Sequence, residues 1–153
     1  MIVETFGPHR QAGVIAGSKN VGKRPEYGGA LTTDQDKLQY TSFKTIPVDH
    51  LNPFIDRQFV YGERTMLARL FLRKGAIVPE HFHENEQITY ILEGALRFTL
   101  GDGRVITVGA GEVLVIPSNL PHKAEAVEDT IDLDVFTPPR ADWIAGTDAY
   151  LRR

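Results

Sequence analysis

Two histidines separated by one residue, His81 and His83, are the residues of this sequence whose types and spacing best fit chemistry. Successive side chains of a β-strand point to opposite faces, so both imidazoles can converge on one point while Phe82 turns away. Gln87 has the same parity, and His122 supplies a third imidazole downstream. Imidazoles suit zinc, iron, nickel and copper, and a side-chain amide can add a weak neutral oxygen ligand. The pattern therefore predicts a metal site.

Other residues compete for the role of ligand. Glu84 and Glu86 are carboxylates and bind cations more strongly than an amide does, but their strand parity is opposite to that of the two histidines. His9 and His50 have no partner pattern and are expected on the surface or in loops. A pair of histidines at this spacing also arises by chance, so the metal interpretation depends on the whole pattern.

Composition limits the possible classes of protein. The chain has 153 residues, of which 42% are hydrophobic and 24% charged, as in a globular protein with one core. The net charge of −3 and the lack of a long basic block argue against a nucleic-acid partner. Cysteine is absent, which excludes disulfides and thiolate chemistry. Without an export signal or an apolar run of roughly 20 residues, we expect a cytoplasmic protein with no membrane partner.

The elements that must position the site are predicted to be short strands. From residue 59 onward, apolar and β-branched residues alternate with polar ones, and Gly101 to Gly103 has the composition of a hairpin turn. The expected strands are residues 65–72, 88–92, 95–100, 105–108, 113–116 and 131–136. Strands with turn signals at intervals of roughly 8 to 12 residues are typical of an all-β sandwich or barrel.

The beginning of the chain differs from the rest. Residues 1–42 are rich in Gly, Lys, Asn, Thr and Asp and are expected to form an irregular or extended arm, whereas residues 43–153 form the β domain. Residues 17–23 fit the first positions of a phosphate-binding P-loop. Arg24 and Pro25 follow where that loop requires a Ser or Thr and a helix, so we reject this interpretation.

The end of the chain, residues 138–153, holds the one plausible helix. We expect it to be short and to pack Trp143, Ile144 and Tyr150 against the barrel.

Two motifs with fixed spacing cover residues 75–126. The first runs Gly75, five residues, His81, one residue, His83, three residues, Gln87, six residues and Gly94. The second runs Gly111, five residues, Pro117, one residue, Asn119, two residues and His122. Together they resemble the two cupin motifs. Gln87 stands where Glu is commonest, Asn119 where Gly is usual, and Ala126 where the second motif ends in Asn.

The resemblance implies a cupin double-stranded β-helix, or jelly-roll barrel, with the metal ligands lining its mouth. By position these ligands would be His81, His83, Gln87 and His122. They would hold one divalent ion, and their spacing does not separate Zn, Ni, Fe, Mn and Co. All four ligands are neutral, so the ion keeps its full charge and attracts an anionic substrate. It could act as a Lewis acid or lower the pKa of bound water.

A second group of candidate residues lies downstream. Asp134 and Phe136 share one face of a strand, and Ile131, Leu133 and Val135 take the other. In a purely structural interpretation, Asp134 and Arg140 form an ion pair and Phe136 belongs to the core. In a functional interpretation, Asp134 is a general acid or base, Arg140 clamps a substrate carboxylate bidentately and Phe136 shapes the pocket.

The combination HxHxxxQ followed by DxFxxxR resembles the small pectin-degradation cupins of the KdgF family. These proteins convert 4,5-unsaturated uronates, sugar acids released by polysaccharide lyases, into linear keto forms. The resemblance implies that the metal would hold ring or carboxylate oxygens of the sugar. Asp134 would move the proton and Arg140 would fix the carboxylate.

Three other functions stay open, because the fold does not choose among them. They are an Fe(II) dioxygenase, a sugar-binding cupin without turnover, and a polyketide cyclase or other isomerase. The expected partner is in each case a small molecule, with a carboxylate favoured. Related small cupins usually dimerise, so we also expect a homodimer.

Overall fold

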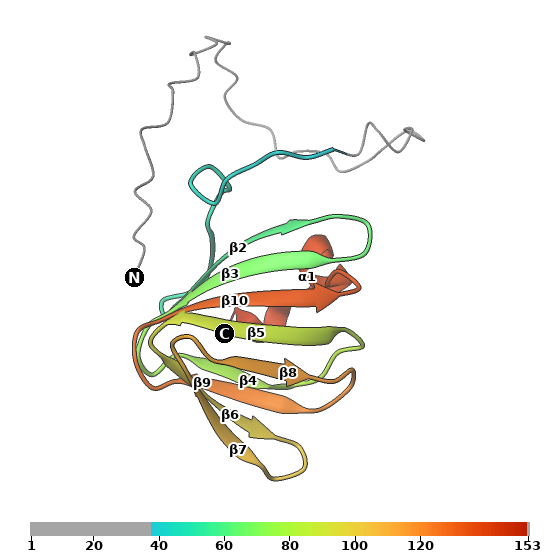
Figure 1. Ribbon diagram of the computed structural model, residues 1–153. Helices are drawn as coiled ribbons and strands as arrows, with labels where there is room; N and C mark the ends of the chain where they lie inside the picture. Colours follow the sequence, from blue (N-terminus) through green and yellow to red (C-terminus); the bar gives the residue numbers. More distant parts are fainter. Residues whose placement is uncertain (1–37, 153) are drawn as a thin grey trace, which may run out of the picture. The chain divides into compact units, whose positions relative to one another are not determined.

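The computed structural model describes residues 38–152, in which ten β-strands form two antiparallel sheets (Figure 1). The first sheet has the order β1 (Asp49–Asn52), β2 (Ile55–Tyr61), β3 (Met66–Leu72), β10 (Thr130–Thr137), β5 (Glu86–Glu93) and β8 (Val113–Ile116). The second has the order β4 (Ile77–His81), β9 (His122–Ala126), β6 (Ala95–Leu100) and β7 (Val105–Gly109). The predicted all-β jelly-roll barrel is confirmed.

The interior is apolar on most strands and polar on one. Along β3, every second residue from Met66 to Leu72 is buried, as the alternation predicts. Along β10 the buried residues are Thr130, Asp132, Asp134 and Phe136, and the aliphatic residues between them are only partly buried. The face of β10 that carries Asp134 and Phe136 is therefore the barrel interior.

Two short helical segments follow β10. They are α1 (Ala141–Ala145) and the 3₁₀-helix η2 (Ala149–Leu151), which confirm the predicted helix in a shorter form. Trp143 is buried and packs edge-on against Phe136, with 5.0 Å between ring centroids. The expectation for Ile144 is wrong, since it is 41% exposed, and Leu151 is buried instead. The αL cap at Gly146 turns the chain, and Leu151 in η2 then packs against the barrel.

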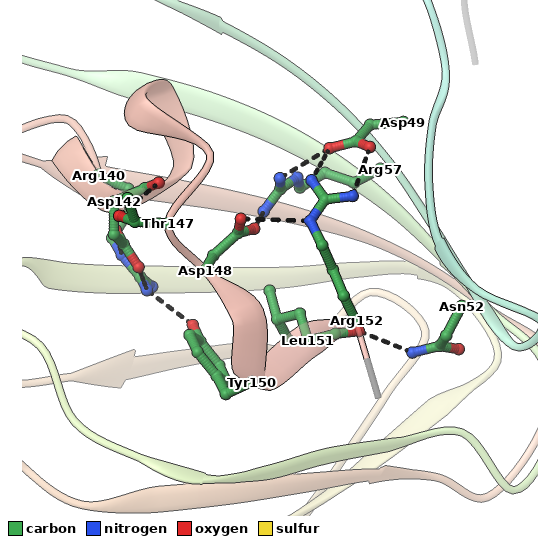
Figure 2. A network of polar contacts seen from close by, with 10 residues as sticks. All are labelled: Asp49, Asn52, Arg57, Arg140, Asp142, Thr147, Asp148, Tyr150, Leu151 and Arg152. Carbon is green, nitrogen blue, oxygen red and sulfur yellow. Dashed lines mark hydrogen bonds and ion pairs between the residues drawn. The ribbon is translucent and has the colours of Figure 1, made fainter.

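A network of ion pairs fixes η2 to the first two strands (Figure 2). Asp148 and Arg57 form a fully buried pair at 2.7 Å. Asp49 contacts both Arg57, at 2.8 Å, and Arg152, at 2.9 Å. The side-chain amide of Asn52 donates to the carbonyl of Leu151. The Arg57 guanidinium also lies 4.2 Å from the centroid of the Trp143 ring, so both helical segments rest on the same side chain.

Some sequence predictions fall outside the described residues. The P-loop-like segment 17–23, His9 and most of the expected arm, residues 1–42, belong to this group. Within residues 38–152 no helix has the length and apolar character needed to cross a bilayer.

Gly94 joins β5 to β6 with a positive φ of 79°, and a Cβ atom there would collide with the main-chain carbonyl of Asp129. We expect Gly94→Ala to lower the free energy of unfolding by roughly 2 to 4 kcal/mol, because it adds this collision to the cost of a left-handed backbone. Chemical denaturation measures the change. Gly103→Ala is the matched control, since its φ is 87° but nothing lies within 4 Å of the added atom. An equal loss of unfolding free energy in the two variants would contradict a contribution from the collision.

Candidate metal centre

Three histidines converge at the mouth of the barrel. The candidate ligand atoms of His81, His83 and His122 all lie within 4.8 Å of one another. His81 ends β4 and pairs in register with His122 on β9. The predicted convergence is therefore confirmed, but the single-strand explanation for it is wrong. His83 follows β4 in a loop, and Gln87 lies on β5 in the other sheet.

Main-chain carbonyls orient all three rings. The Nδ1 atoms of His81, His83 and His122 lie 2.8, 3.0 and 2.8 Å from the carbonyl oxygens of Pro79, Asn85 and Leu120. A carbonyl oxygen only accepts hydrogen bonds, so each Nδ1 carries the hydrogen and donates it. Each Nε2 then keeps a lone pair. Protein histidines that bind metals are commonly arranged in this way.

Two features of the polar atoms show that these residues fit a cation. The Nε2 atom of His122 is buried and has no hydrogen-bond partner among the described residues. The Nε2 atom of His83 lies 3.2 Å from Oε1 of Gln87, which places two acceptors face to face in the tautomer derived above. A cation held between these atoms would satisfy both acceptors and would give the orphaned nitrogen of His122 a partner.

The histidines are neutral near pH 7. Burial, with the neighbouring His122, lowers the pKa of His81 to about 3. Burial, with the charge of Arg140, lowers the pKa of His83 to about 4. Burial also lowers the pKa of His122. The neutral imidazole is the form that binds a metal, so the site is prepared for one without first losing protons.

Residues 69–137 match the family described as Cupin domain. This part of the chain is a cupin domain. The structure of KdgF from Halomonas sp. is similar, with 27% sequence identity, a TM-score of 0.64, and coverage of 69% of this chain and 99% of that one.

Two further similar proteins match this chain over only part of their length or at low sequence identity. The oxalate decarboxylase OxdC of Bacillus subtilis is 31% identical over 105 residues, which are 60% of this chain and 27% of that protein. The polyketide cyclase RemF of Streptomyces resistomycificus has a TM-score of 0.59 and covers 67% of this chain and 80% of that one. At 24% identity, this last similarity shows the fold alone.

The competing candidate ligands are more exposed than the three histidines. Glu84 and Glu86 are exposed, and neither belongs to the group of potential ligands formed by the three histidines. His50 lies on β1, is exposed and contacts Asp56 at 2.6 Å. His50 is thus at the surface, as expected, and the exclusion of Glu84 and Glu86 as ligands stays a prediction.

Gln87 links the histidines to a buried carboxylate. Its amide nitrogen donates to Oγ1 of Thr89 and to Oδ1 of Asp134, both at 2.9 Å, and the Thr89 hydroxyl donates to the same carboxylate oxygen. These bonds turn Oε1 of Gln87 toward His83. Burial raises the pKa of Asp134 above its ordinary value, and the hydrogen bonds from Thr89 and Gln87 oppose this rise only in part.

Asp132 lies two residues before Asp134 on the same buried face. Burial, with the charge of Asp134, raises the pKa of Asp132 well above its ordinary value, and its Oδ1 atom has no partner among the described residues. Neither Asp132 nor Thr89 was predicted from the sequence as a site residue. Their strand parity with Asp134 and Gln87 is the signal that would have identified them.

Arg140 is buried, and its partners are Asp142 and Tyr150. Its Nε and Nη2 atoms donate to both carboxylate oxygens of Asp142, at 2.9 and 2.7 Å, and Nη2 also donates to the Tyr150 hydroxyl at 2.7 Å. The ion pair considered between Arg140 and Asp134 is wrong. Because Asp142 occupies one edge of the guanidinium, the edge that carries Nη1 is the one left for a ligand.

Two spaces of different size meet at the centre. An internal cavity of about 40 Å³ reaches Gln87, His122 and Asp134, whereas an open cleft of about 760 Å³ lies above the histidines. The cavity suits an ion or a water, and roughly 300 to 1,000 Å³ is usual for a small-molecule site. A substrate therefore fits the cleft. The side chains that line both spaces would separate it from Gln87 and Asp134 in the cavity.

Proposed function

We propose that this cupin is a metal-dependent enzyme that opens and ketonises a 4,5-unsaturated uronate or a closely similar carboxylated sugar. The observation that carries the proposal is the buried Asp134 carboxyl group, hydrogen-bonded to the Gln87 amide behind three neutral histidines. A carboxyl group with a raised pKa at such a place is suited to proton transfer near neutral pH.

His81, His83 and His122, with Gln87 as the fourth ligand, would hold the divalent ion. Bound there, the ion would supply Lewis acidity toward a sugar oxygen. The protein ligands are all neutral, so they leave the positive charge of the site uncompensated. Glu80 and Glu84 at the rim of the cleft are exposed, and solvent screens their repulsion of an anion.

The reaction needs no oxidant or reductant, since substrate and product are isomers. Ring opening breaks the bond between the anomeric carbon and the ring oxygen, as the anomeric hydroxyl becomes a carbonyl and the ring oxygen becomes an enol. Ketonisation then moves the enol proton to the adjacent carbon. Asp134 would carry this proton, the free edge of Arg140 would bind the sugar carboxylate, and Phe136 would shape the wall beside His83, with 5.6 Å between their ring centroids.

The comparisons support a small carboxylated substrate. Similarity to KdgF extends over 99% of that protein, and the sequence motif shared with that family includes Asp134, Phe136 and Arg140. The curated relative OxdC is named for oxalate, another small carboxylate, although this chain spans only 27% of its length.

The test is to incubate the protein, loaded in turn with Zn²⁺, Mn²⁺, Co²⁺, Ni²⁺ or Fe²⁺, with uronates released by a polysaccharide lyase. We expect faster loss of the ultraviolet absorbance of the double bond conjugated with the carboxylate, and no faster loss after chelation of the metal. A decay rate equal to that without protein would refute the proposal. Consumption of dioxygen would instead support the dioxygenase function, and ligand binding without turnover would support a sugar-binding cupin.

The expected homodimer and the cytoplasmic location stay predictions. On the outer face of the first sheet, β5 and β8 expose apolar side chains that are 37% to 56% accessible. These residues are Ile88, Tyr90, Leu92, Val113 and Val115. A dimer that covers this face would remove apolar surface from water, and sedimentation analysis would detect it.

A further inference from the structure

Tyr150, on η2, stands between the internal cavity and the open cleft. Of the residues that the structure describes, only three line both spaces, namely His81, Arg140 and Tyr150. The Tyr150 ring stacks on His81 with 4.8 Å between centroids and 29° between planes. A molecule in the cleft therefore meets this ring beside His81. Tyr150 also lies beyond Thr137, where the match to the cupin family ends.

The hydrogen bond from Arg140 to Tyr150 leaves the hydroxyl hydrogen of Tyr150 free to donate. Nη2 of Arg140 donates to the hydroxyl oxygen of Tyr150, so the oxygen is the acceptor and its own hydrogen remains available. Asp142 already takes Nε and Nη2 of Arg140. The Nη1 edge of Arg140 and the hydroxyl hydrogen of Tyr150 are the donors that remain, and their parent groups are held together by the 2.7 Å bond.

The segment that carries Tyr150 is anchored on both sides. Asp148 forms the fully buried pair with Arg57, and Leu151 is buried and accepts a hydrogen bond from Asn52. Figure 2 shows Tyr150 projecting from this anchored segment toward Arg140. A side chain fixed in this way binds a ligand at a low entropic cost, because its position is set before the ligand arrives.

We infer that Tyr150 is a substrate-binding residue, which donates its hydroxyl hydrogen to the carboxylate of a sugar acid beside the Nη1 edge of Arg140. This inference deepens the proposed function and rests on it for the site at which the substrate binds. Asp142 and Tyr150 together orient the guanidinium of Arg140. Because Asp142 occupies the Nε and Nη2 donors of Arg140, the Tyr150 hydroxyl supplies the second donor to the substrate carboxylate. The carboxylate is then held by one charged and one neutral donor rather than by a guanidinium fork.

The test compares two ligands that are not turned over, D-glucuronate and its methyl ester, by calorimetric titration of the Zn²⁺-loaded full chain. We expect Tyr150→Phe to weaken binding of glucuronate by about 10-fold and binding of the ester by less than about 3-fold, since a hydrogen bond to a charged acceptor contributes more than one to a neutral acceptor. The ring and its stacking on His81 are kept, so a loss of packing would weaken both ligands equally.

Tyr90→Phe is the matched control, because Tyr90 is exposed on the outer face of β5 and should leave both affinities unchanged. Zn²⁺ content and the thermal midpoint, measured for each variant, report on the metal site and the fold. Equal weakening of the two ligands, no weakening, or no binding of glucuronate by the unaltered protein would overturn the inference. Failure to convert unsaturated uronates would overturn only the proposed reaction, since neither titration depends on turnover.

Discussion

His122→Ala is expected to abolish metal binding at neutral pH. Of the three histidines only His122 is buried, at 2% exposure, and its Nε2 atom has no hydrogen-bond partner among the described residues. Loss of an outer contact to a metal-binding histidine already costs roughly 10 to 100-fold in affinity, so loss of the ligand itself should cost more than about 100-fold. Metal analysis after dialysis and competition with a chromophoric chelator measure the effect.

His50→Ala is the control for this experiment, because His50 is exposed on β1 and is not among the grouped histidines. Saturating metal should raise the thermal midpoint of the unaltered protein and of the control, since a ligand that binds only the folded state stabilises it. The His122→Ala variant should show no such shift. Equal affinity in all three proteins would place the metal elsewhere.

Asp134→Asn is expected to lower the rate of uronate conversion by about 10² to 10⁴-fold while metal content is unchanged. Asparagine keeps an oxygen that can accept from Gln87 and Thr89, so the arrangement around Gln87 should persist. What the variant loses is the titratable group. The steady-state rate and the metal stoichiometry of the same preparation measure the two outcomes separately.

The same variant should be at least as stable as the unaltered protein at pH 7. Burial raises the pKa of Asp134 in the folded state, so the folded protein binds this proton more tightly than the unfolded chain does. The stabilisation that the proton provides is lost as the pH rises through the folded-state pKa, which leaves a buried charge at neutral pH. A neutral side chain removes that cost. Asp56→Asn, on β2 beside His50, is the control. A stable, metal-loaded and fully active Asp134→Asn variant would refute the proton-transfer role.

The strands that could be predicted from the sequence are those with apolar residues between turn signals, and the clearest of them bury every second residue. Residues 66–72, 95–100 and 130–137 are of this kind. The segment β9 was missed because its sequence, HKAEA, has no β-branched residue, and its small buried alanines fit against neighbouring strands. The segment β4 was predicted only through the strand expected to carry His81 and His83, and Pro79 weakens its β pattern. Proline is tolerated there since β4 is at the edge of its sheet.

The glycine spacing of the two motifs predicted the grouping of the three histidines more accurately than the strand parity did. Asn119, which replaces the usual glycine of the second motif, has a φ of 61°, and asparagine is one of the few other residues that adopt this conformation readily. The turn before His122 is thus preserved. Tyr150 could not be predicted as a partner of Arg140, because it reaches the guanidinium only through the αL turn at Gly146 and the anchoring of η2. Asp142 lies only two residues after Arg140, in the first turn of α1.

The three imidazoles take their orientation from main-chain carbonyls, which no substitution of a neighbouring side chain can delete. Gln87 differs, because the side chains of Thr89 and Asp134 set its direction. In evolutionary terms, the histidine half of the centre is insulated from single nearby mutations, and the Gln87 half is open to them. Divergence of metal preference or of substrate among descendants of this protein should therefore accumulate at Gln87, Thr89 and Asp134, while the histidine geometry drifts little.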